Sequence, residues 1–279
     1  MKKAGFIYNP KVAAAEALAR DLSKASKSLD TAWVCSSWDE EKARAEVPGS
    51  ELLVSVGGDG TILRTARIAL PWQSPILGVN MGKLGFLTEV SPSEALKRMP
   101  AFIAGEGWVE ERAMLQAEMT RSGQPTSLPL SALNDVVVAR GASCRVIQVK
   151  TWVDGEFLGA YKADGLIVAT ATGSTGYALA AGGPILQPQA KEMVLKAVAP
   201  HLTLNTALVL PSTSVIEMEL QSDLAAVLSL DGQVELPLKN GDRVKVRRSQ
   251  YVTRFLRARP RNYFYGCLQQ TLARPNGAV

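Results

Sequence analysis

The sequence has a single histidine, His201, among 279 residues. Two-histidine zinc sites and the helical H-E-x-x-H motif are therefore excluded within one chain, and a Ser-His or Cys-His nucleophile pair would have to use this residue. If the protein is an enzyme, its proton-accepting group is expected to be a carboxylate. His201 follows Pro200 in a turn-like stretch, which favours a role in surface structure or packing over a role in chemistry.

Cysteines and long apolar runs are also scarce. The three cysteines, Cys35, Cys144 and Cys267, are far apart and lack metal-ligand spacing, so they indicate buried thiols in a reducing compartment rather than a disulfide framework. No apolar run approaches the roughly 18 residues of a membrane span. The first eight residues contain too few apolar side chains for a signal peptide. We therefore expect a cytoplasmic protein with no membrane association.

The positive charge is concentrated in one segment. The net charge is +5, and residues 239–261 hold nine Lys or Arg residues and one acidic residue, Asp242. A nucleic-acid patch is one interpretation. However, Arg243, Lys245 and Arg247 alternate with valines, as on a strand with one solvated face, and this second interpretation is favoured. A third use is attraction of an anionic nucleotide. No nucleic-acid partner is expected.

The chain is expected to form two domains. Residues 1–99 alternate short apolar runs with helical patterns, which predicts βαβ units and a parallel sheet. Residues 100–255 are richer in strand patterns, with the hairpin-type turn pairs Asp154-Gly155, Asp231-Gly232 and Asn240-Gly241. Residues 256–279 are expected to rejoin the first domain. The prediction is an α/β N-terminal domain with a Rossmann-like parallel sheet and a β-rich C-terminal domain.

Several helices are expected at specific places. Ser91-Pro92-Ser93-Glu94 is a capping box that opens a helix, which Pro100 is expected to end. Within the strand-rich part, residues 177–181 and 190–199 show helical patterns. Residues 262–273 form a further candidate helix.

The strongest local motif is Gly57-Gly58-Asp59-Gly60-Thr61, which lies between a buried-strand pattern and a helix pattern. Glycines let backbone N–H groups approach an anion, and a helix N-terminus adds donors and a favourable dipole, so the motif predicts a phosphate cradle. It is neither a Walker loop nor a G-x-G-x-x-G turn. The alternative is a plain strand-to-helix corner. Asp59 argues against this alternative, because a carboxylate at an anion site should repel phosphate unless it binds a metal or transfers a proton.

A second motif runs from Asp164 through Thr172-Gly173-Ser174-Thr175-Gly176-Tyr177 to Gly183-Pro184. A strand again ends in a loop of small residues and hydroxyls. Thr172, Ser174 and Thr175 offer uncharged hydrogen-bonding groups, and Tyr177 could cover a flat ring. An ordinary tight turn is an equally good interpretation of this motif alone. Two such loops indicate two nucleotides or one long nucleotide.

These motifs, in their order along the chain, resemble those of the NAD kinase family. The set comprises Gly57–Thr61, Gly78–Thr88, Asn134-Asp135, Asp164–Pro184 and Ser229–Gln233. The resemblance extends from about residue 5 to residue 270. The first motif is shared with diacylglycerol, sphingosine and 6-phosphofructokinase-type enzymes, whereas the stretch from Asp164 is much more specific.

The resemblance implies an activity and a set of site residues. The family transfers the terminal phosphate of ATP, or of polyphosphate in some members, to the 2′-hydroxyl of the adenosine ribose of NAD. Asp59 would be the catalytic residue. The implied nucleotide-binding residues are Gly57, Gly58, Gly60, Thr61, Asn134, Asp135, Lys162, Asp164, Thr172, Thr175, Gly176, Tyr177, Ala178, Leu179, Ala180, Ala199 and Gln233. Mg²⁺ or another divalent cation would arrive with ATP, since the sequence shows no dedicated metal cage. A homodimer or homotetramer is also implied.

The sequence departs from the family pattern at two places. Asp135 stands where the family usually has Glu, and Gly176, Ala178 and Ala180 stand where many members have Ala, Ser and Ser. Two other activities stay open at this point. One is a lipid kinase of the same superfamily, which predicts an apolar acceptor groove. The other is an inactive dinucleotide sensor, against which the presence of Asp59 argues. The expected location of the active site is between the Asp59 loop and the Thr172–Tyr177 loop.

Overall fold

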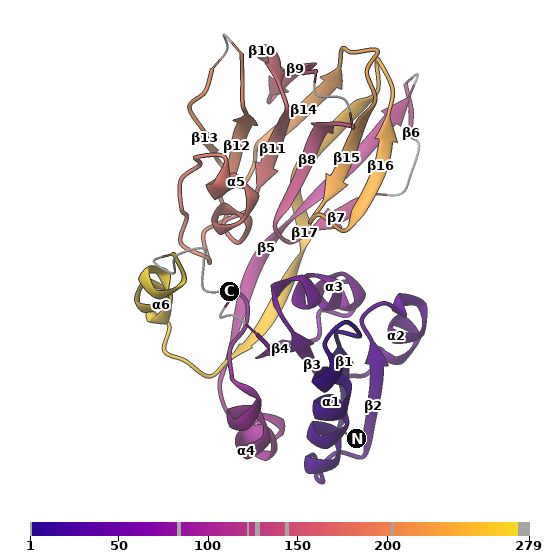
Figure 1. Cartoon of the computed structure of the whole chain (residues 1–279), viewed down its shortest axis with the longest axis vertical. Helices are drawn as coiled ribbons and strands as arrows, with labels where there is room; N and C mark the ends of the chain where they lie inside the picture. The colour runs from indigo at the N-terminus through magenta and orange to yellow at the C-terminus, as the bar shows by residue number, and fades with distance from the viewer. Residues whose placement is uncertain are drawn as a thin grey trace. The chain divides into compact units, whose positions relative to one another are not determined.

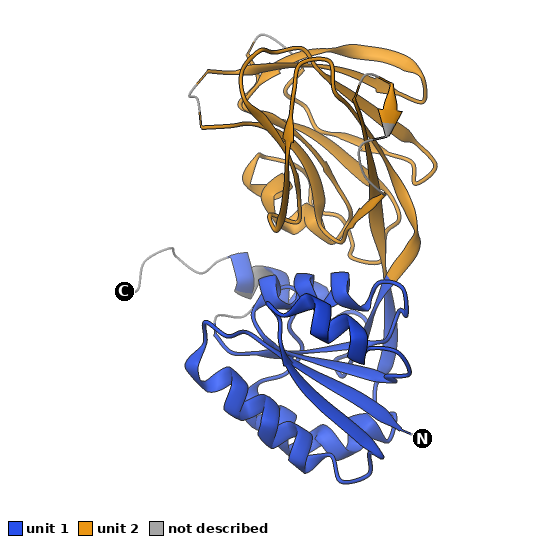
Figure 2. Cartoon of the chain, turned by 90° about the vertical axis from the view of Figure 1, so that its right-hand side faces the viewer, with its two compact units in different colours: residues 1–111, 253–279 blue, residues 112–252 orange. Residues whose placement is uncertain are grey.

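The computed structural model describes residues 2–82, 85–121, 123–125, 129–142, 145–201 and 204–272. The chain forms two compact units, residues 1–111 with 253–279 and residues 112–252 (Figure 2). The boundaries fall inside the long strands β5 (Trp108–Arg121) and β17 (Arg243–Arg257), so both strands contribute to both units. The domain boundaries expected from the sequence stay a prediction, because compactness does not test which parts fold independently.

The first unit is built on a parallel sheet. Its strand order is β17–β4–β3–β1–β2, and every pairing in this series is parallel. The strands besides β17 are β1 (Lys3–Tyr8), β2 (Thr31–Ser36), β3 (Leu52–Gly57) and β4 (Ile76–Asn80). Strand β17 enters this sheet by pairing Phe255 with Ile76. The predicted α/β fold with a parallel sheet is confirmed.

Helices cover both faces of this sheet (Figure 1). They are α1 (Ala13–Ala25), α2 (Glu40–Glu46), α3 (Asp59–Ala69) and α4 (Pro92–Ile103). The unit also contains α6 (Tyr263–Leu272), which follows β17 in the chain and does not cover the sheet in Figure 1. Strand β3 is buried along its whole length, so its apolar side chains serve both faces. Val54 packs in the cluster formed with α1 and α4, whereas Ser55 on the opposite face accepts a hydrogen bond from Thr65 of α3 (3.0 Å).

Helix α4 begins as predicted and ends later than predicted. The Ser91 hydroxyl accepts the N–H of Glu94 (3.3 Å), and Pro92 occupies the first turn. The prediction that Pro100 ends the helix is wrong, because α4 continues to Ile103 with Pro100 inside it. Proline removes one backbone donor, but burial of Met99 and Phe102 on either side of it stabilises the last turn.

The second unit contains two antiparallel sheets that face one another. One sheet comprises β10, β9, β14 and β17 in that order; β5 pairs with β17, and β6 and β7 pair with β5. The other has the order β13–β12–β11–β8–β15–β16. The remaining bounds are β6 (Gln124–Pro125), β7 (Leu130–Ala132), β8 (Asp135–Arg140), β9 (Ile147–Val153), β10 (Glu156–Ala163), β11 (Gly165–Ala169), β12 (Met193–Val198), β13 (Leu208–Leu210), β14 (Val215–Leu220), β15 (Ala226–Leu230) and β16 (Val234–Leu238).

The main core of this unit lies between the two sheets. Val136 and Leu166 of one sheet pack with Met218 and Val246 of the other. A smaller cluster on the outer face of the β8–β11–β12 sheet buries Ala178 of helix α5 (Tyr177–Ala180) against strand residues. Strand alternation therefore buries both faces of this sheet and anchors α5 on its outer side. The predicted β-rich second domain is confirmed as a fold class.

One expected helix of this unit is a strand. Residues 190–199 were expected to be helical, but β12 occupies Met193–Val198 and pairs with β11 and β13. Its side chains alternate between clusters: Met193 and Leu195 face the main core, and Val194 faces the outer one. A short apolar run does not distinguish a strand buried on both faces from a helix, and here the neighbouring strands decide.

The turn pairs behave in two ways. Asp154-Gly155 joins the paired strands β9 and β10, and Asp231-Gly232 joins β15 and β16; both Asp residues have positive φ, as in primed hairpin turns. Asn240-Gly241 also forms a turn, but it connects β16 to β17, which lie in different sheets. It is therefore a sheet-to-sheet connection and no hairpin.

The basic segment is compensated by acids from other strands. On β17, Arg243 and Lys245 lie opposite Glu219 and Glu217 of β14 and form ion pairs with them (2.6 and 3.6 Å). Arg247 pairs with Glu118 (3.0 Å). These cross-strand pairs favour the interpretation of a solvated strand face over a nucleic-acid patch.

The remaining expectations concern cysteines and membranes. Cys35 and Cys267 are buried thiols, whereas Cys144 lies outside the described residues, as do Lys83 and Leu84 of the Gly78–Thr88 motif. In the part of the chain that the structure describes, no helix combines the length and apolar character that crossing a membrane requires.

Candidate active site

The Gly57–Thr61 motif forms the junction between β3 and α3. Gly57 ends the strand, Gly58 is the N-cap, and Asp59, Gly60 and Thr61 form the first helical turn. The Gly58 carbonyl accepts the N–H groups of Thr61 (2.9 Å) and Ile62 (3.2 Å). A Cβ on Gly57 would lie 2.3 Å from Thr61 Oγ1, so close packing requires this glycine.

Gly58 and Gly60 have no such structural requirement. Beyond the adjacent backbone, a Cβ on either residue would meet no atom of the described residues within 4 Å, and neither glycine has positive φ. If the two glycines only formed a corner, a side chain could replace their hydrogens without strain. Their lack of a Cβ instead keeps open the space beside the helix N-terminus, where N–H groups and the helix dipole favour an anion. This geometry supports the phosphate-cradle interpretation.

Asp59 is held by the loop that follows β4. Its Oδ2 accepts the N–H of Phe86 (3.0 Å) and its Oδ1 accepts the N–H of Leu87 (3.2 Å). A Cβ on Gly85 would lie 2.1 Å from Asp59 Oδ1, so the close approach of loop and carboxylate depends on that glycine. Burial raises the pKa of Asp59, and the N–H donors together with the charge of Arg257 oppose this rise. A carboxylate with a raised pKa is a stronger proton acceptor than an ordinary aspartate.

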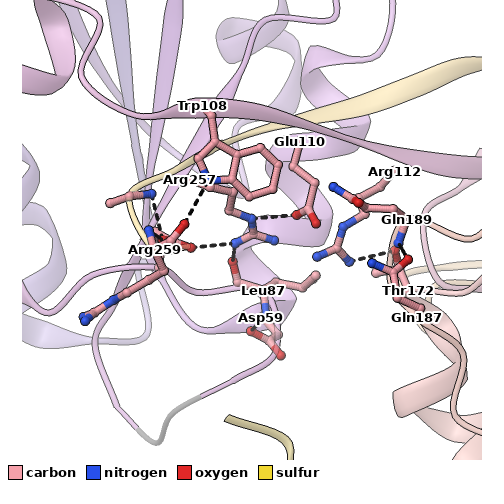
Figure 3. A network of polar contacts seen from close by, with 12 residues as sticks. Asp59, Leu87, Trp108, Glu110, Arg112, Thr172, Gln187, Gln189, Arg257 and Arg259 are labelled. Carbon is pink, nitrogen blue, oxygen red and sulfur yellow. Dashed lines mark hydrogen bonds and ion pairs between the residues drawn. The ribbon is translucent and has the colours of Figure 1, made fainter. Parts of the chain in front are cut away.

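A buried arginine, Arg257, contacts the loop that holds Asp59, and the sequence did not predict this contact. Arg257 donates to the Leu87 carbonyl (3.2 Å) and forms ion pairs with Glu89 (3.0 Å) and Glu110 (2.7 Å), as Figure 3 shows in part. Glu89 also accepts the backbone N–H of Ala258 (2.8 Å). The sequence gives no signal for this network, because Glu89 and Arg257 are 168 positions apart and Arg257 lies in the basic segment.

In the second unit, the Asn134-Asp135 pair lies where β8 begins. The Asn134 carbonyl accepts the N–H of Thr170 (2.9 Å), and the Thr170 hydroxyl donates to the Leu133 carbonyl (2.6 Å). Gly173 packs so closely that its Cβ would be 2.1 Å from the Asn134 carbonyl oxygen. The side-chain oxygen of Asn134 is buried and has no hydrogen-bond partner among the described residues. A buried acceptor of this kind is suited to a donor from a ligand.

Asp135 is also buried, and its surroundings disfavour its charged form. Burial, followed by the nearby negative charge of Asp231, raises the pKa of Asp135 to about 7. The carboxyl group therefore exchanges its proton near neutral pH and can donate as well as accept hydrogen bonds.

Several hydroxyl groups of the loop after β11 form hydrogen bonds within the protein. Thr172 is buried and its Oγ1 accepts a hydrogen bond from Arg112 (3.2 Å), while Ser174 is buried and donates to the Ala171 carbonyl (2.6 Å). Thr175 donates to the Thr172 carbonyl (3.1 Å). Ser174 therefore stabilises the loop. The 3-10 turn Gly173–Thr175 leads through the exposed Gly176 into helix α5.

Helix α5 presents Tyr177 outward. The Tyr177 side chain is 46% exposed, Ala180 is exposed, Leu179 is partly buried and Ala178 is buried. This arrangement agrees with a ring-covering role for Tyr177. Hydroxyl groups at 178 and 180 are absent, and at 178 the site is apolar and packed, which suits alanine.

Three of the other expected residues lie at the opposite end of β11. Asp164 directly precedes that strand and accepts a hydrogen bond from Arg140 (2.7 Å), while Asp135 pairs with Ala169 at the far end. The five-residue strand separates the two groups by roughly 15 Å. Lys162 and Ala199 accompany Asp164: Lys162 belongs to β10, and Ala199, with φ of 45°, follows β12. Gln233 follows the Asp231-Gly232 turn, whose Asp231 contacts Asn134.

The fold and these groups together define a class of protein. A parallel α/β unit carries an open glycine cradle at a helix N-terminus, with a carboxylate of raised pKa beside it. Anion binding combined with a positioned proton acceptor is the chemistry of a phosphotransferase of the kinase type.

Comparison with known proteins identifies the family. The chain matches the ATP-NAD kinase N-terminal domain over residues 5–107 and the ATP-NAD kinase C-terminal domain over residues 133–258. It is 43% identical to an NAD kinase of Dehalococcoides mccartyi, covering 100% of this chain and 98% of the relative. An NAD kinase of Chloroflexus aurantiacus is 39% identical, with 98% and 99% covered.

Solved structures agree in fold. An NAD kinase from Archaeoglobus fulgidus in complex with ATP has a TM-score of 0.77 at 27% identity, covering 98% of this chain and 99% of that one. Yeast NADH kinase complexed with NADH has a TM-score of 0.84 at 23% identity, with 100% and 89% covered. The chain belongs to the NAD kinase family and is a kinase, which confirms the resemblance seen in its motifs.

Proposed function

We propose that this protein transfers the terminal phosphate of ATP to the 2′-hydroxyl of the adenosine ribose of NAD, giving NADP. The observation that carries the proposal is Asp59, a carboxylate with a raised pKa at the edge of an open glycine cradle. Family membership supplies the substrates, and the similarity to an Archaeoglobus fulgidus NAD kinase in complex with ATP supports ATP as the phosphate donor.

The first unit would handle phosphate and proton. The N-terminal N–H groups of α3 would bind phosphate oxygens in the space beside Gly58 and Gly60. Asp59 would accept the proton of the attacking ribose hydroxyl, which is a poor nucleophile near neutral pH. Its two oxygens accept the backbone N–H groups of Phe86 and Leu87, and a carboxylate has further lone pairs for this hydroxyl. Positioning and charge neutralisation would provide most of the acceleration.

The second unit would bind the dinucleotide. Asn134 offers a buried acceptor without a partner among the described residues, and Asp135 adds a carboxyl group that can donate near neutral pH. Tyr177 would cover a ring from α5. The family pattern assigns the remaining nucleotide-binding roles, which belong to this proposal. These residues are Gly57, Thr61, Lys162, Asp164, Thr172, Thr175, Gly176, Ala178, Leu179, Ala180, Ala199 and Gln233.

A divalent cation, Mg²⁺ by preference, would accompany ATP and neutralise charge on the phosphoryl oxygens. No group of three or more possible metal ligands occurs among the residues that the structure describes. Near the cradle, Asp59 offers one carboxylate, which suits an ion held mainly by phosphates. A cytoplasmic location, supported by the buried thiols Cys35 and Cys267, and a homo-oligomeric state also belong to the proposal.

One assay tests the activity. Purified protein with Mg²⁺ is offered ATP or polyphosphate as donor and NAD, NADH or a diacylglycerol as acceptor, and NADP or phospholipid is measured. The proposal expects NADP from ATP and NAD. Phosphorylation of the lipid alone would support the lipid-kinase alternative, and tight NAD binding without turnover for any donor would support the sensor alternative.

The role of Asp59 is tested separately. Asp59→Asn keeps the size of the side chain and removes the proton acceptor. Turnover is expected to fall by about 100-fold or more, with an unchanged circular dichroism spectrum. Near-normal turnover of a folded Asp59→Asn protein would refute the assigned role.

A further inference from the structure

Asp231, in the turn between β15 and β16, makes an unusual number of contacts with one short segment. Its Oδ1 accepts the N–H groups of Asn134 (2.7 Å) and Asp135 (3.1 Å), and its Oδ2 accepts the N–H of Leu133 (2.9 Å). Its own N–H donates to the Asp135 carbonyl (3.0 Å). Four hydrogen bonds therefore connect this turn to three consecutive residues at the start of β8.

The same unit contains a second turn of the same chemistry. Asp154 also precedes glycine in a hairpin, with φ of 52° against 53° for Asp231. Its carboxylate accepts the N–H of Val215 (2.7 Å) and the hydroxyl of Ser214 (2.9 Å), and its N–H donates to the Val215 carbonyl (2.9 Å). An Asp-Gly turn that fixes the start of a neighbouring strand is thus an ordinary structural device in this protein.

The difference lies in what each turn holds. Asp154 fixes the start of β14, which carries none of the expected site residues. Asp231 fixes Asn134 and Asp135. The side-chain oxygen of Asn134 has no protein partner among the described residues, so its position is set by the backbone to which it is attached. That backbone is held by Asp231 on one side and by Thr170 on the other.

We propose that Asp231 is a positioning residue for dinucleotide binding, whose carboxylate fixes the backbone of residues 133–135 so that the side chains of Asn134 and Asp135 meet the nucleotide in one arrangement. This inference rests on the proposed function of the second unit. It assigns Asp231 a role through Asn134 and Asp135, without contact with the substrate.

A second effect of Asp231 is electrostatic. Burial of Asp135 is the larger cause of its raised pKa, and the negative charge of Asp231 adds to the rise. On the other side of β8, the residue paired with Asp135 is the apolar Ala169. Arg112 of β5 donates to Thr172 on the loop after β11, and Arg140 pairs with Asp164 at the far end of β8. Glu235 lies on β16, which pairs with β15. Removing the charge of Asp231 is therefore expected to lower the pKa of Asp135.

Asp231→Asn is the informative variant, with Asp154→Asn as its matched control. Asparagine accepts positive φ, so both turns are expected to fold, while each variant loses a charge and one acceptor oxygen. For Asp231→Asn, the KM for NAD is expected to rise about tenfold or more, with kcat changed much less. For Asp154→Asn, the KM for NAD is expected to stay near the wild-type value despite a similar loss of stability.

Two measurements do not depend on catalysis. Amide hydrogen exchange at residues 133–135 is expected to accelerate in Asp231→Asn alone. Carboxyl ¹³C NMR follows the titration of Asp135, whose signal is assigned through Asp135→Asn. In Asp231→Asn, the midpoint of this titration is expected to move to lower pH by roughly one unit. Asp231→Glu, which keeps the charge one methylene further away, is a second variant expected to raise the KM for NAD while Asp135 titrates near its wild-type pH.

Equal effects of Asp231→Asn and Asp154→Asn on the KM for NAD, with unchanged exchange at residues 133–135, would overturn the proposal. The outcome is distinct from failure of the proposed function. If the wild-type protein did not phosphorylate NAD, the proposed function would be refuted. Amide hydrogen exchange and the Asp135 titration would still report whether Asp231 holds residues 133–135.

Discussion

Replacement of Arg257 is expected to destabilise the first unit far more than replacement of Arg254 on the same strand. In both ion pairs of Arg257, the side chains of the arginine and its partners, Glu89 and Glu110, are at most 9% exposed. Arg254 and Glu111 are 42% and 55% exposed. Removing one partner of a buried pair costs about 3–5 kcal/mol, whereas an exposed pair contributes about 0.2–1 kcal/mol.

Urea unfolding of Arg257→Gln and Arg254→Gln measures this difference. Four of the five tryptophans, Trp33, Trp38, Trp72 and Trp108, belong to the first unit, so fluorescence reports mainly on it. Arg257→Gln is expected to lower the free energy of unfolding by about 3–5 kcal/mol. Combining it with Glu89→Gln and Glu110→Gln should restore part of the loss, since the uncompensated carboxylates are then also removed.

The same substitution is expected to change catalysis through Asp59. The charge of Arg257 lowers the pKa of Asp59, so its removal raises that pKa further. The proposed role of Asp59 requires its deprotonated form, so the acidic limb of the kcat profile is expected to move to higher pH in Arg257→Gln and to stay in place in Arg254→Gln. Equal unfolding free energies for the two variants, together with coincident pH profiles, would refute the reasoning.

Three further predictions follow from single residues. Gly60→Ala should increase the free energy of unfolding by roughly 0.5–1 kcal/mol, because alanine is the better helix former and its Cβ would meet no atom of the described residues beyond the adjacent backbone. The same substitution should weaken ATP binding in a titration, and unchanged ATP affinity would contradict the cradle. The pKa of Asp135 is raised from 3.8 to about 7, so the folded state holds this proton over that range, and the stability that the group contributes falls as pH rises. Asp135→Asn should therefore flatten the dependence of the unfolding free energy on pH between about 4 and 7. An unchanged slope would exclude the shift. His201 is exposed, and its backbone N–H donates to the Lys162 carbonyl (2.7 Å). His201→Gln should therefore leave kcat within about twofold in a steady-state assay, and loss of activity in a folded protein would show that carboxylate chemistry alone is insufficient.

Much of the local structure could be predicted because it depends on neighbours in the sequence. Apolar periodicity gave the alternating strands and helices of the first unit, and the Asp-Gly pairs gave two hairpin turns. The errors arose where packing overrides local preference. Pro100 lies within α4 because Met99 and Phe102 are buried, and residues 193–198 form a strand because β11 and β13 pair with it.

The sequence by itself determined the family, through several motifs in their order along the chain. It also predicted the phosphate cradle and the carboxylate expected to accept the proton, because both belong to one short contiguous motif. Only the tertiary structure decided how those residues are supported. Arg257 lies behind the Asp59 loop and Asp231 holds Asn134, over separations of 168 positions to Glu89 and 97 positions to Asn134. Such contacts depend on which strands become neighbours in space, and no local pattern of side chains specifies that.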